Sequence, residues 1–316
     1  MKIIKKLIKI ICVIILILFL GLILDYIRLN ISYKINKYDY SVKIYGNKDK
    51  YTPQGLTYSS KYNVIISSSY NSKHLVSKVY IIDFDNNKLL KEVELRNTDN
   101  TINKKHVGGI TTDNKTLWIT NDFEVNEYDL KEIINTNKKY VVSKKKTKLL
   151  NRGDLCTYKD NTLYIGDFFL NPFYKIKDNN PLLMAFDTKN LDYNKPKYII
   201  SLPKMVQGLA ITDDNNIIVT RSFTNLIKSD LSIYNNVIEN KKSYYTLNNK
   251  KIPYYKLNKN NKIKSIKLPP MAEELFYKDN DLYILFENSS DTYFYAYPKI
   301  KNIMKININT LIKKES

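Results

Sequence analysis

The sequence is poor in the residues that build stapled or metal-held folds. It has two Cys and two His in 316 residues, which excludes a disulfide scaffold and a framework of several Cys/His zinc sites. Eight Gly argue against a Gly-rich phosphate loop. A mean hydropathy of −0.38 with a single long apolar run excludes a protein with many membrane spans. Intrinsic disorder is excluded by 27 Tyr and 11 Phe, which give the chain ample apolar surface to bury.

The one long apolar run lies near the N-terminus. Ile10–Leu24 contains no charged residue, and counting back to Leu7 includes Lys9, whose ammonium group can reach the membrane interface. Residues 7–24 then approach the roughly 20 residues that span the hydrocarbon core. Four lysines precede or enter this run: Lys2, Lys5, Lys6 and Lys9. Only Arg28, offset by Asp25, follows closely.

This charge asymmetry predicts the orientation of the chain. The positive-inside rule places the N-terminus in the cytoplasm. We therefore expect residues 1–29 to form a cytoplasmic basic tip and an uncleaved transmembrane signal anchor, and residues 30–316 to form an extracellular, membrane-anchored domain. A cleaved signal peptide is the main alternative, but no small-x-small cleavage site follows the run. A lipoprotein is disfavoured because no small residue precedes Cys12.

The rest of the chain contains an internal repeat. Each unit begins with a pair of small or polar residues and a short strand in which apolar residues alternate with polar ones. A polar turn rich in Asp, Asn and Lys and a second strand follow. This order is the pattern of a β-hairpin. The five units are residues 53–70, 107–122, 152–169, 206–223 and 272–289. They align on Leu56, Ile110, Leu155, Leu209 and Leu275. Further strand-like runs lie between the hairpins, and four strands per repeated unit predict a β-propeller.

The ends of the chain predict how the ring closes. The last unit is followed by one further strand, within residues 302–312, and residues 40–46 can supply the missing fourth strand. Such pairing removes exposed sheet edges. We therefore expect an all-β propeller of five blades, with six blades, a β-sandwich or a solenoid as alternatives. The excess length falls in regions predicted to be loops, such as 168–180 and 240–262.

Propeller geometry predicts which side chains converge. The innermost strand of each blade starts, and the second strand ends, on the same face of the disc, around the mouth of the channel. The strand-start candidates are Gln54, His106, Asp154, Gln207, Glu273 and Glu274. The strand-end candidates include Asn121, Asp122, Asp167, Arg221 and Glu287. So many acidic groups in a chain of net charge +20 favour a cation at the mouth.

These candidates allow three interpretations. Asn121, Asp154, Asp167 and Glu273 offer oxygen ligands to Ca²⁺ or another divalent cation, which would polarise a lactone, ester or phosphate oxygen. In that case the candidate catalytic residues are His106, Asp154 and Glu273. The candidates for direct ligand binding are Gln54, His106, Gln207, Arg221, Glu274 and Glu287. Alternatively, each of these residues only satisfies hydrogen bonds at the strand ends and holds neighbouring blades together.

Several motifs resemble those of a known group. The stretches PQGLTYS, HVGGI, VQGLAI with a later TRSF, and KLPPMAEELF with a later LFENS resemble secreted and membrane-anchored bacterial β-propeller proteins of unassigned function, over roughly residues 50–300. They are similar, more distantly, to the SMP-30/gluconolactonase/strictosidine-synthase-like superfamily. That resemblance implies a divalent metal at the channel mouth, held at the matching positions Glu273, Asn121 and Asp167.

The net charge points to the surroundings of the protein. Without the four N-terminal lysines the chain keeps 47 basic residues against 31 acidic ones, which favours contact with anionic lipid headgroups or an anionic cell-surface polymer. A coding bias toward Lys and Asn is the alternative explanation, and no nucleic-acid-binding module is present. Our leading hypothesis is a membrane-anchored propeller that binds a carbohydrate, a cell-wall polymer or a protein at the channel mouth. The alternative is a divalent-metal-dependent hydrolase of the lactonase or phosphoesterase type.

The predicted orientation can be tested on cells. Protease added to intact cells should digest the chain beyond Asp25, because the positive-inside rule places that part outside. The measurement is an immunoblot against a C-terminal tag, with a cytoplasmic protein as the control for lysis. Protection of the tag in unlysed cells would contradict the orientation.

Overall fold

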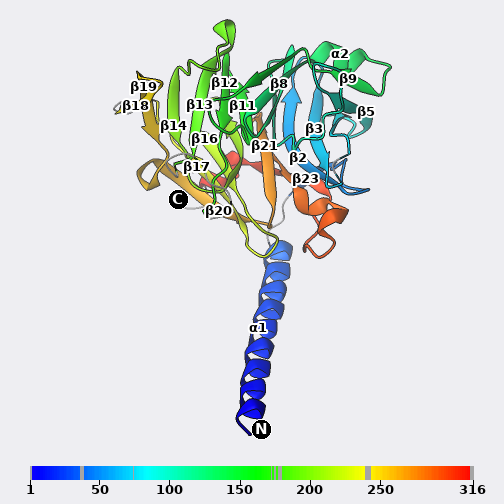
Figure 1. Cartoon of the computed structure of the whole chain (residues 1–316), viewed down its shortest axis with the longest axis vertical. Coiled ribbons are helices and arrows are strands. Elements are labelled where there is room, and N and C mark those ends of the chain that lie inside the picture. The colour runs from blue at the N-terminus through cyan, green and yellow to red at the C-terminus, as the bar shows by residue number, and fades with distance from the viewer. Residues whose placement is uncertain are drawn as a thin grey trace. The chain divides into compact units, whose positions relative to one another are not determined.

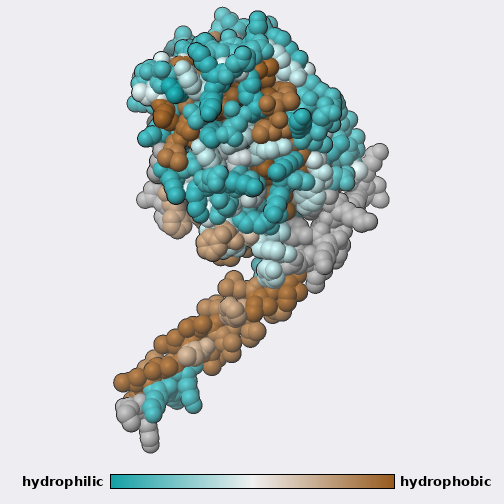
Figure 2. Space-filling model, turned by 90° about the vertical axis from the view of Figure 1, so that its right-hand side faces the viewer, coloured by the Kyte–Doolittle hydropathy of each residue, from teal (hydrophilic) through white to brown (hydrophobic). Residues whose placement is uncertain are grey.

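The computed structural model describes residues 2–35, 39–73, 75–171, 173, 176, 180–238 and 243–313. The chain divides into two compact units, Met1–Tyr38 and Asp39–Ser316. The first unit is the helix α1 (Lys2–Ile35), within which Ile3–Ile27 is long and apolar enough to cross a membrane. A helix rises about 1.5 Å per residue, so this stretch exceeds the roughly 30 Å hydrocarbon core. Figure 2 shows its visible side as apolar except near the N-terminal tip.

The second unit consists of five β-sheets, which we call blades 1 to 5 (Figure 1). Blade 1 contains β2 (Tyr51–Ser59), β3 (Val64–Asn71), β4 (Lys78–Asp83) and β5 (Leu89–Arg96). Blade 2 contains β6 (Gly109–Thr112), β7 (Thr116–Asn121), β8 (Glu124–Asp129) and β10 (Lys145–Lys148). Blade 3 contains β11 (Leu155–Lys159), β12 (Thr162–Gly166), β13 (Leu182–Asp187) and β14 (Tyr198–Ser201). Blade 4 contains β15 (Val206–Ile211), β16 (Ile217–Arg221), β17 (Ser229–Tyr234) and β20 (Lys262–Leu268).

Blade 5 joins the two ends of the propeller unit. It contains β21 (Ala272–Lys278), β22 (Asp281–Phe286), β23 (Asn302–Asn307) and β1 (Asp39–Lys43). The strands β1 and β23 are antiparallel, with Tyr40 opposite Met304, and the amide of Ile44 donates to the carbonyl of Lys301 at 2.9 Å. The predicted closure by residues 40–46 is therefore confirmed.

The five predicted hairpins form the inner half of each blade. The inner strands β2, β6, β11, β15 and β21 contact one another in this order, and β21 contacts β2, so that the ring is complete. Each hairpin turn places one asparagine in the left-handed region, which Asn tolerates better than most residues. These are Asn63, Asn114, Asn161, Asn215 and Asn280. The five-bladed propeller predicted from the repeat is confirmed.

The expected loop at 240–262 is wrong for its described part. Residues 243–256 form the hairpin of β18 (Ser243–Leu247) and β19 (Lys250–Lys256), whose two-residue turn has Asn248 and Asn249 at positive φ. Strand β19 pairs in parallel with β14, so the third sheet has six strands (Figure 1). Residues 239–242 lie outside the described part.

Short elements complete the unit. In blade 1, β9 (Tyr140–Val142) adds in parallel to β5. The short helices are α2 (Leu130–Asn135) and α3 (Ile308–Lys313), and the 3₁₀ turns are η2 (Thr188–Asn190), η3 (Lys259–Asn261), η4 (Glu287–Ser289) and η5 (Asp291–Tyr293). The apolar core lies between adjacent blades, as in the cluster of Ile44, Leu56 and Ile303 that joins blade 5 to blade 1.

The closing strand should carry measurable stability. Ile44 is 1% exposed in the cluster between blades 5 and 1, so Ile44→Ala should lower the free energy of unfolding by about 2–4 kcal/mol. Urea unfolding measures this, and Lys43→Ala, at the adjacent exposed position that ends β1, should change it by less than about 0.5 kcal/mol. Equal effects of the two variants would show that ring closure adds little.

Candidate functional site

One position of the repeat faces a common cavity in all five blades. This position lies two residues before the leucine on which the repeats align. Its occupants are Gln54, Gly108, Gly153, Gln207 and Glu273, and all five line a cavity of about 500 Å³. The cavity therefore lies where the inner strands begin, at the mouth of the channel.

Local backbone irregularities direct three of these side chains. The pairing register shifts between Pro53 and Leu56, between Val206 and Gly208, and between Ala272 and Leu275. A β-bulge of this kind turns a side chain that regular pairing would send elsewhere.

Glycines next to this position allow the inner strands to approach closely. A Cβ on Gly208 would lie 2.6 Å from the carbonyl oxygen of Glu273, and a Cβ on Gly109 would lie 2.5 Å from the amide nitrogen of Cys156. Any larger residue would push neighbouring blades apart. Local packing thus explains why the repeat keeps glycine there in three blades.

Two glutamates meet on one wall of the cavity. Glu273, on β21, is 5% exposed, and its carboxyl group is hydrogen-bonded to that of Glu287, at the start of η4. Glu287 also accepts hydrogen bonds from Gln54 Nε2 and from the Tyr293 hydroxyl, each at 3.1 Å. Burial raises the pKa of both carboxyl groups, and for Glu273 the charge of Glu287 raises it further. A hydrogen bond between two carboxyl groups requires that at least one of them is protonated.

An arginine organises another part of the lining. Arg152 donates to both oxygens of Asp154, with Nε–Oδ2 at 2.9 Å and Nη2–Oδ1 at 2.8 Å, and to Asp122 at 3.0 Å. The Phe168 amide donates to Asp154 at 2.8 Å. Burial raises the pKa of Asp154, and the hydrogen bonds and charge of Arg152 oppose this rise. Both carboxylate oxygens of Asp154 are therefore hydrogen-bonded to Arg152.

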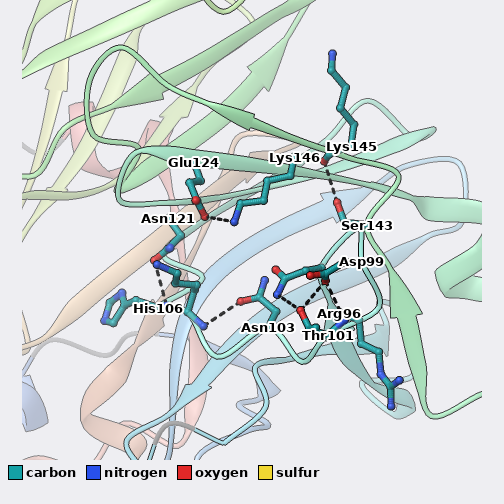
Figure 3. Close-up of polar contacts among 12 residues, drawn as sticks. Arg96, Asp99, Thr101, Asn103, His106, Asn121, Glu124, Ser143, Lys145 and Lys146 are labelled. Carbon is teal, nitrogen blue, oxygen red and sulfur yellow. Dashed lines mark hydrogen bonds and ion pairs between the residues drawn. The ribbon is translucent and has the colours of Figure 1, made fainter.

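His106 and Asn121 contribute from blade 2. The amide of His106 donates to Asn121 Oδ1 at 3.1 Å (Figure 3), while the amide nitrogen Nδ2 of Asn121 is buried and has no hydrogen-bond partner among the described residues. The His106 ring lies against the ring of Tyr70, with centroids 4.3 Å apart. The surrounding protein desolvates the imidazole and lowers its pKa, so His106 is neutral near pH 7.

Three predicted site residues are not part of the described cavity lining. Asp167 accepts from the Leu182 amide at 3.1 Å. Glu274 accepts from the Leu209 amide at 2.9 Å and so links β21 to β15. Arg221 donates through Nε to the carbonyl of Lys204 at 2.9 Å. These contacts match the interpretation that polar groups near the channel hold blades and loops together.

The predicted cation ligands are each engaged with other groups. Each forms a hydrogen bond within the protein. Asn121 Oδ1 accepts from the His106 amide, Asp154 accepts from Arg152 and Asp167 accepts from the Leu182 amide. The carboxyl group of Glu273 is hydrogen-bonded to that of Glu287. Within the described ranges, no group of three or more His, Cys, Asp or Glu side chains is arranged to hold a metal ion. These residues do not fit a shared ion in this arrangement. The divalent cation stays a prediction.

The structure adds lining residues that the repeat pattern did not indicate. They are mostly aromatic or apolar: Tyr70, Phe168, Phe223, Met271, Tyr293 and Tyr295, together with Arg152. Phe168 and Phe223 follow the second strands of their hairpins, and the stretch DTYFYAY contains Tyr293 and Tyr295. An aromatic residue just after the second strand of a hairpin could therefore have indicated a lining residue from the sequence.

The comparisons with known proteins give this chain no family and no function. No protein-family model matches the sequence, and no curated protein matches it. Among solved structures, the chain is similar to glutaminyl cyclase from Myxococcus xanthus, with 6% identity, a TM-score of 0.49, and coverage of 85% of this chain and 94% of that chain. It is also similar to the PQQ-bound aldose sugar dehydrogenase from Streptomyces coelicolor, with 12% identity, a TM-score of 0.45, and coverage of 85% and 96%. Both are β-propeller proteins, and the relation to the SMP-30-like superfamily stays a prediction.

Asp167 should make stability depend on pH. Burial raises its pKa from 3.8 to about 8, so between these values the folded state holds a proton that the unfolded state has lost, and stability falls as pH rises toward 8. Asp167→Asn cannot ionise and should unfold at higher free energy than the parent at pH 8, by on the order of 2–4 kcal/mol, with little difference at pH 4.

Urea unfolding at the two pH values measures this difference. The exposed Asp213, which pairs with Lys159, supplies the control Asp213→Asn, for which we expect no such pH-dependent gain. A gain in Asp167→Asn that is the same at pH 4 and pH 8 would contradict the assigned cause.

Proposed function

We propose that this protein is a single-pass membrane protein whose propeller binds a small polar ligand in the cavity at the channel mouth. In this proposal α1 is an uncleaved signal anchor, the N-terminus is cytoplasmic and the propeller lies outside the cell. The lysines before the apolar run and their scarcity after it support this orientation.

The cavity is the observation that carries the proposed binding function. Its volume of about 500 Å³ falls within the roughly 300–1,000 Å³ of small-molecule sites. Every blade contributes to its lining, for example through Gln54, Asn121, Asp154, Gln207 and Glu273. A closed ring holds these groups on rigid strands, which limits the ordering cost of binding.

The lining favours a carbohydrate unit as the ligand. Carboxyl and amide groups from Glu287, Gln54 and Gln207 supply hydrogen-bond donors and acceptors for hydroxyl groups. Phe168 and Phe223 add aromatic surface for the apolar face of a sugar ring. Beyond the four N-terminal lysines, the excess of 47 basic over 31 acidic residues would attract the propeller to an anionic cell-surface polymer that displays such units.

Metal-dependent hydrolysis stays the alternative function. It requires Asn121, Asp154 and Glu273 to give up the partners they have in this structure. Binding of a carbohydrate leaves the contacts of Asn121 with His106 and of Asp154 with Arg152 in place, and therefore the geometry favours it.

Thermal unfolding of the full chain in lipid nanodiscs tests the binding function. Glucose, galactose, N-acetylglucosamine and glucosamine are each added at 10 mM. A sugar that binds with a Kd near 1 mM adds about 1.4 kcal/mol of stability and should raise Tm by about 2–4 °C.

Two tryptophan variants locate the effect. Gln207→Trp places an indole in the cavity and should abolish the rise in Tm. Lys189→Trp, at an exposed site in η2, should retain it. No rise with any of the four sugars, or a rise that persists in Gln207→Trp, would overturn the proposal.

A further inference from the structure

The two hydrogen-bonded glutamates hold at least one proton between them. Two carboxyl groups can hydrogen-bond to each other only if one of them is protonated, so Glu273 and Glu287 together carry at most one negative charge. Among the described residues, no lysine, arginine or histidine forms an ion pair with either group. The charge of the pair is thus stabilised by neutral donors, Gln54 and Tyr293.

The groups packed around the pair do not supply a positive charge. Tyr70, on β3, is hydrogen-bonded to Tyr293, and Glu274 follows Glu273 on β21. The neutral ring of His106 lies against Tyr70. Lys299 contacts the segment that follows Glu287, and its ammonium group donates to the backbone carbonyls of Ser290 and Tyr293.

The cavity as a whole is acidic in a basic protein. Among its described lining residues, Arg152 is the one that carries a positive charge, and Asp154 and Asp122 already neutralise it. Together with Glu273 and Glu287, the lining holds four carboxyl groups against this one cation, in a chain of net charge +20. A partly buried anion without a counter-ion favours a ligand that is positively charged.

The size and remaining lining of the cavity indicate an organic cation. A bare metal ion fills only a small part of about 500 Å³. Phe168, Phe223 and Met271 line the same cavity and offer apolar surface, which favours a ligand with a carbon skeleton.

We propose that the cavity binds an organic ammonium group, such as that of an amino sugar, with its charge held by Glu273 and Glu287. This inference rests on the proposed binding function and names the class of ligand. The ammonium group keeps its own protons and donates them to the two carboxylates. The proton that Glu273 had shared with Glu287 is released to the solvent, so that charge and atoms balance.

Calorimetric titration of the full chain in lipid nanodiscs tests the proposal with two matched probes. D-glucosamine, protonated at pH 6, and D-glucose differ at one ring substituent. Glucosamine should bind at least tenfold more tightly than glucose and than the neutral N-acetylglucosamine. Repeating the titration in buffers of different ionisation enthalpy should show release of up to one proton per glucosamine bound.

Variants of the pair identify the site. Glu273→Gln and Glu287→Gln, measured separately, should each weaken glucosamine binding at least tenfold and abolish proton release. Glu92→Gln removes an exposed carboxylate that pairs with Lys78 on the outer part of blade 1 and should leave both unchanged. If one variant fails to fold, the other variant and the comparison of glucosamine with glucose on the parent chain still test the proposed ammonium site.

The outcomes separate this inference from the function beneath it. Equal affinity for glucosamine and glucose, or glucosamine binding that survives in both glutamine variants, overturns the ammonium site but leaves a carbohydrate-binding cavity. If glucosamine fails to bind at 20 mM while calcium chloride binds and releases the proton, the site takes an inorganic cation and the inference is wrong. Loss of all sugar binding in the parent chain removes the proposed function as well.

Discussion

The pairing of β1 with β23 is the constraint on which the propeller depends. Without it, blade 5 would end in an unpaired edge at β23, and the ring could open between blades 5 and 1. The apolar cluster around Ile44 and Leu56 fills the same junction. Closure fixes the five inner strands around one axis, and only then does a repeated position in the sequence become a shared cavity. The cavity therefore exists because of the closed topology, and the chemistry of its lining depends on that closure.

Polar groups at such an axis carry an energetic cost that the structure meets in two ways. Glu274 and Asp167 are buried, and each accepts a hydrogen bond from a backbone amide. The bond to Glu274 joins blade 5 to blade 4, and the bond to Asp167 lies within blade 3. Burial nevertheless raises the pKa of each, because a carboxylate loses hydration there. Glu273 and Glu287 instead satisfy each other through one proton at the cavity wall. The first arrangement stabilises the ring, and the second leaves a charge that faces a ligand-sized space.

Much of the site follows from the propeller pattern, and its exceptions have physical causes. Gln54, His106, Gln207 and Glu287 reach the cavity because strand starts and second-strand ends share one face. Glu274 does not, because its carboxyl group accepts the hydrogen bond of the Leu209 amide on the neighbouring inner strand. The hairpin at 243–256 was expected to be a loop because it interrupts the repeat. Its apolar residues Tyr245, Leu247 and Ile252 pack against the core, but the hairpin lies outside the four-strand unit that the repeat defines.

The sequence by itself determined the apolar anchor run, the five hairpins and the closing strand, because these depend on local hydrophobic patterns and on turn residues such as Asn114 and Asn280. Only the tertiary structure decided which polar groups act together. The bulges at Gln54, Gln207 and Glu273 aim these side chains inward, and Arg152 binds Asp154 rather than leaving it open. The meeting of Glu273 with Glu287 depends on distances of a few ångströms between separate segments, which no local pattern encodes.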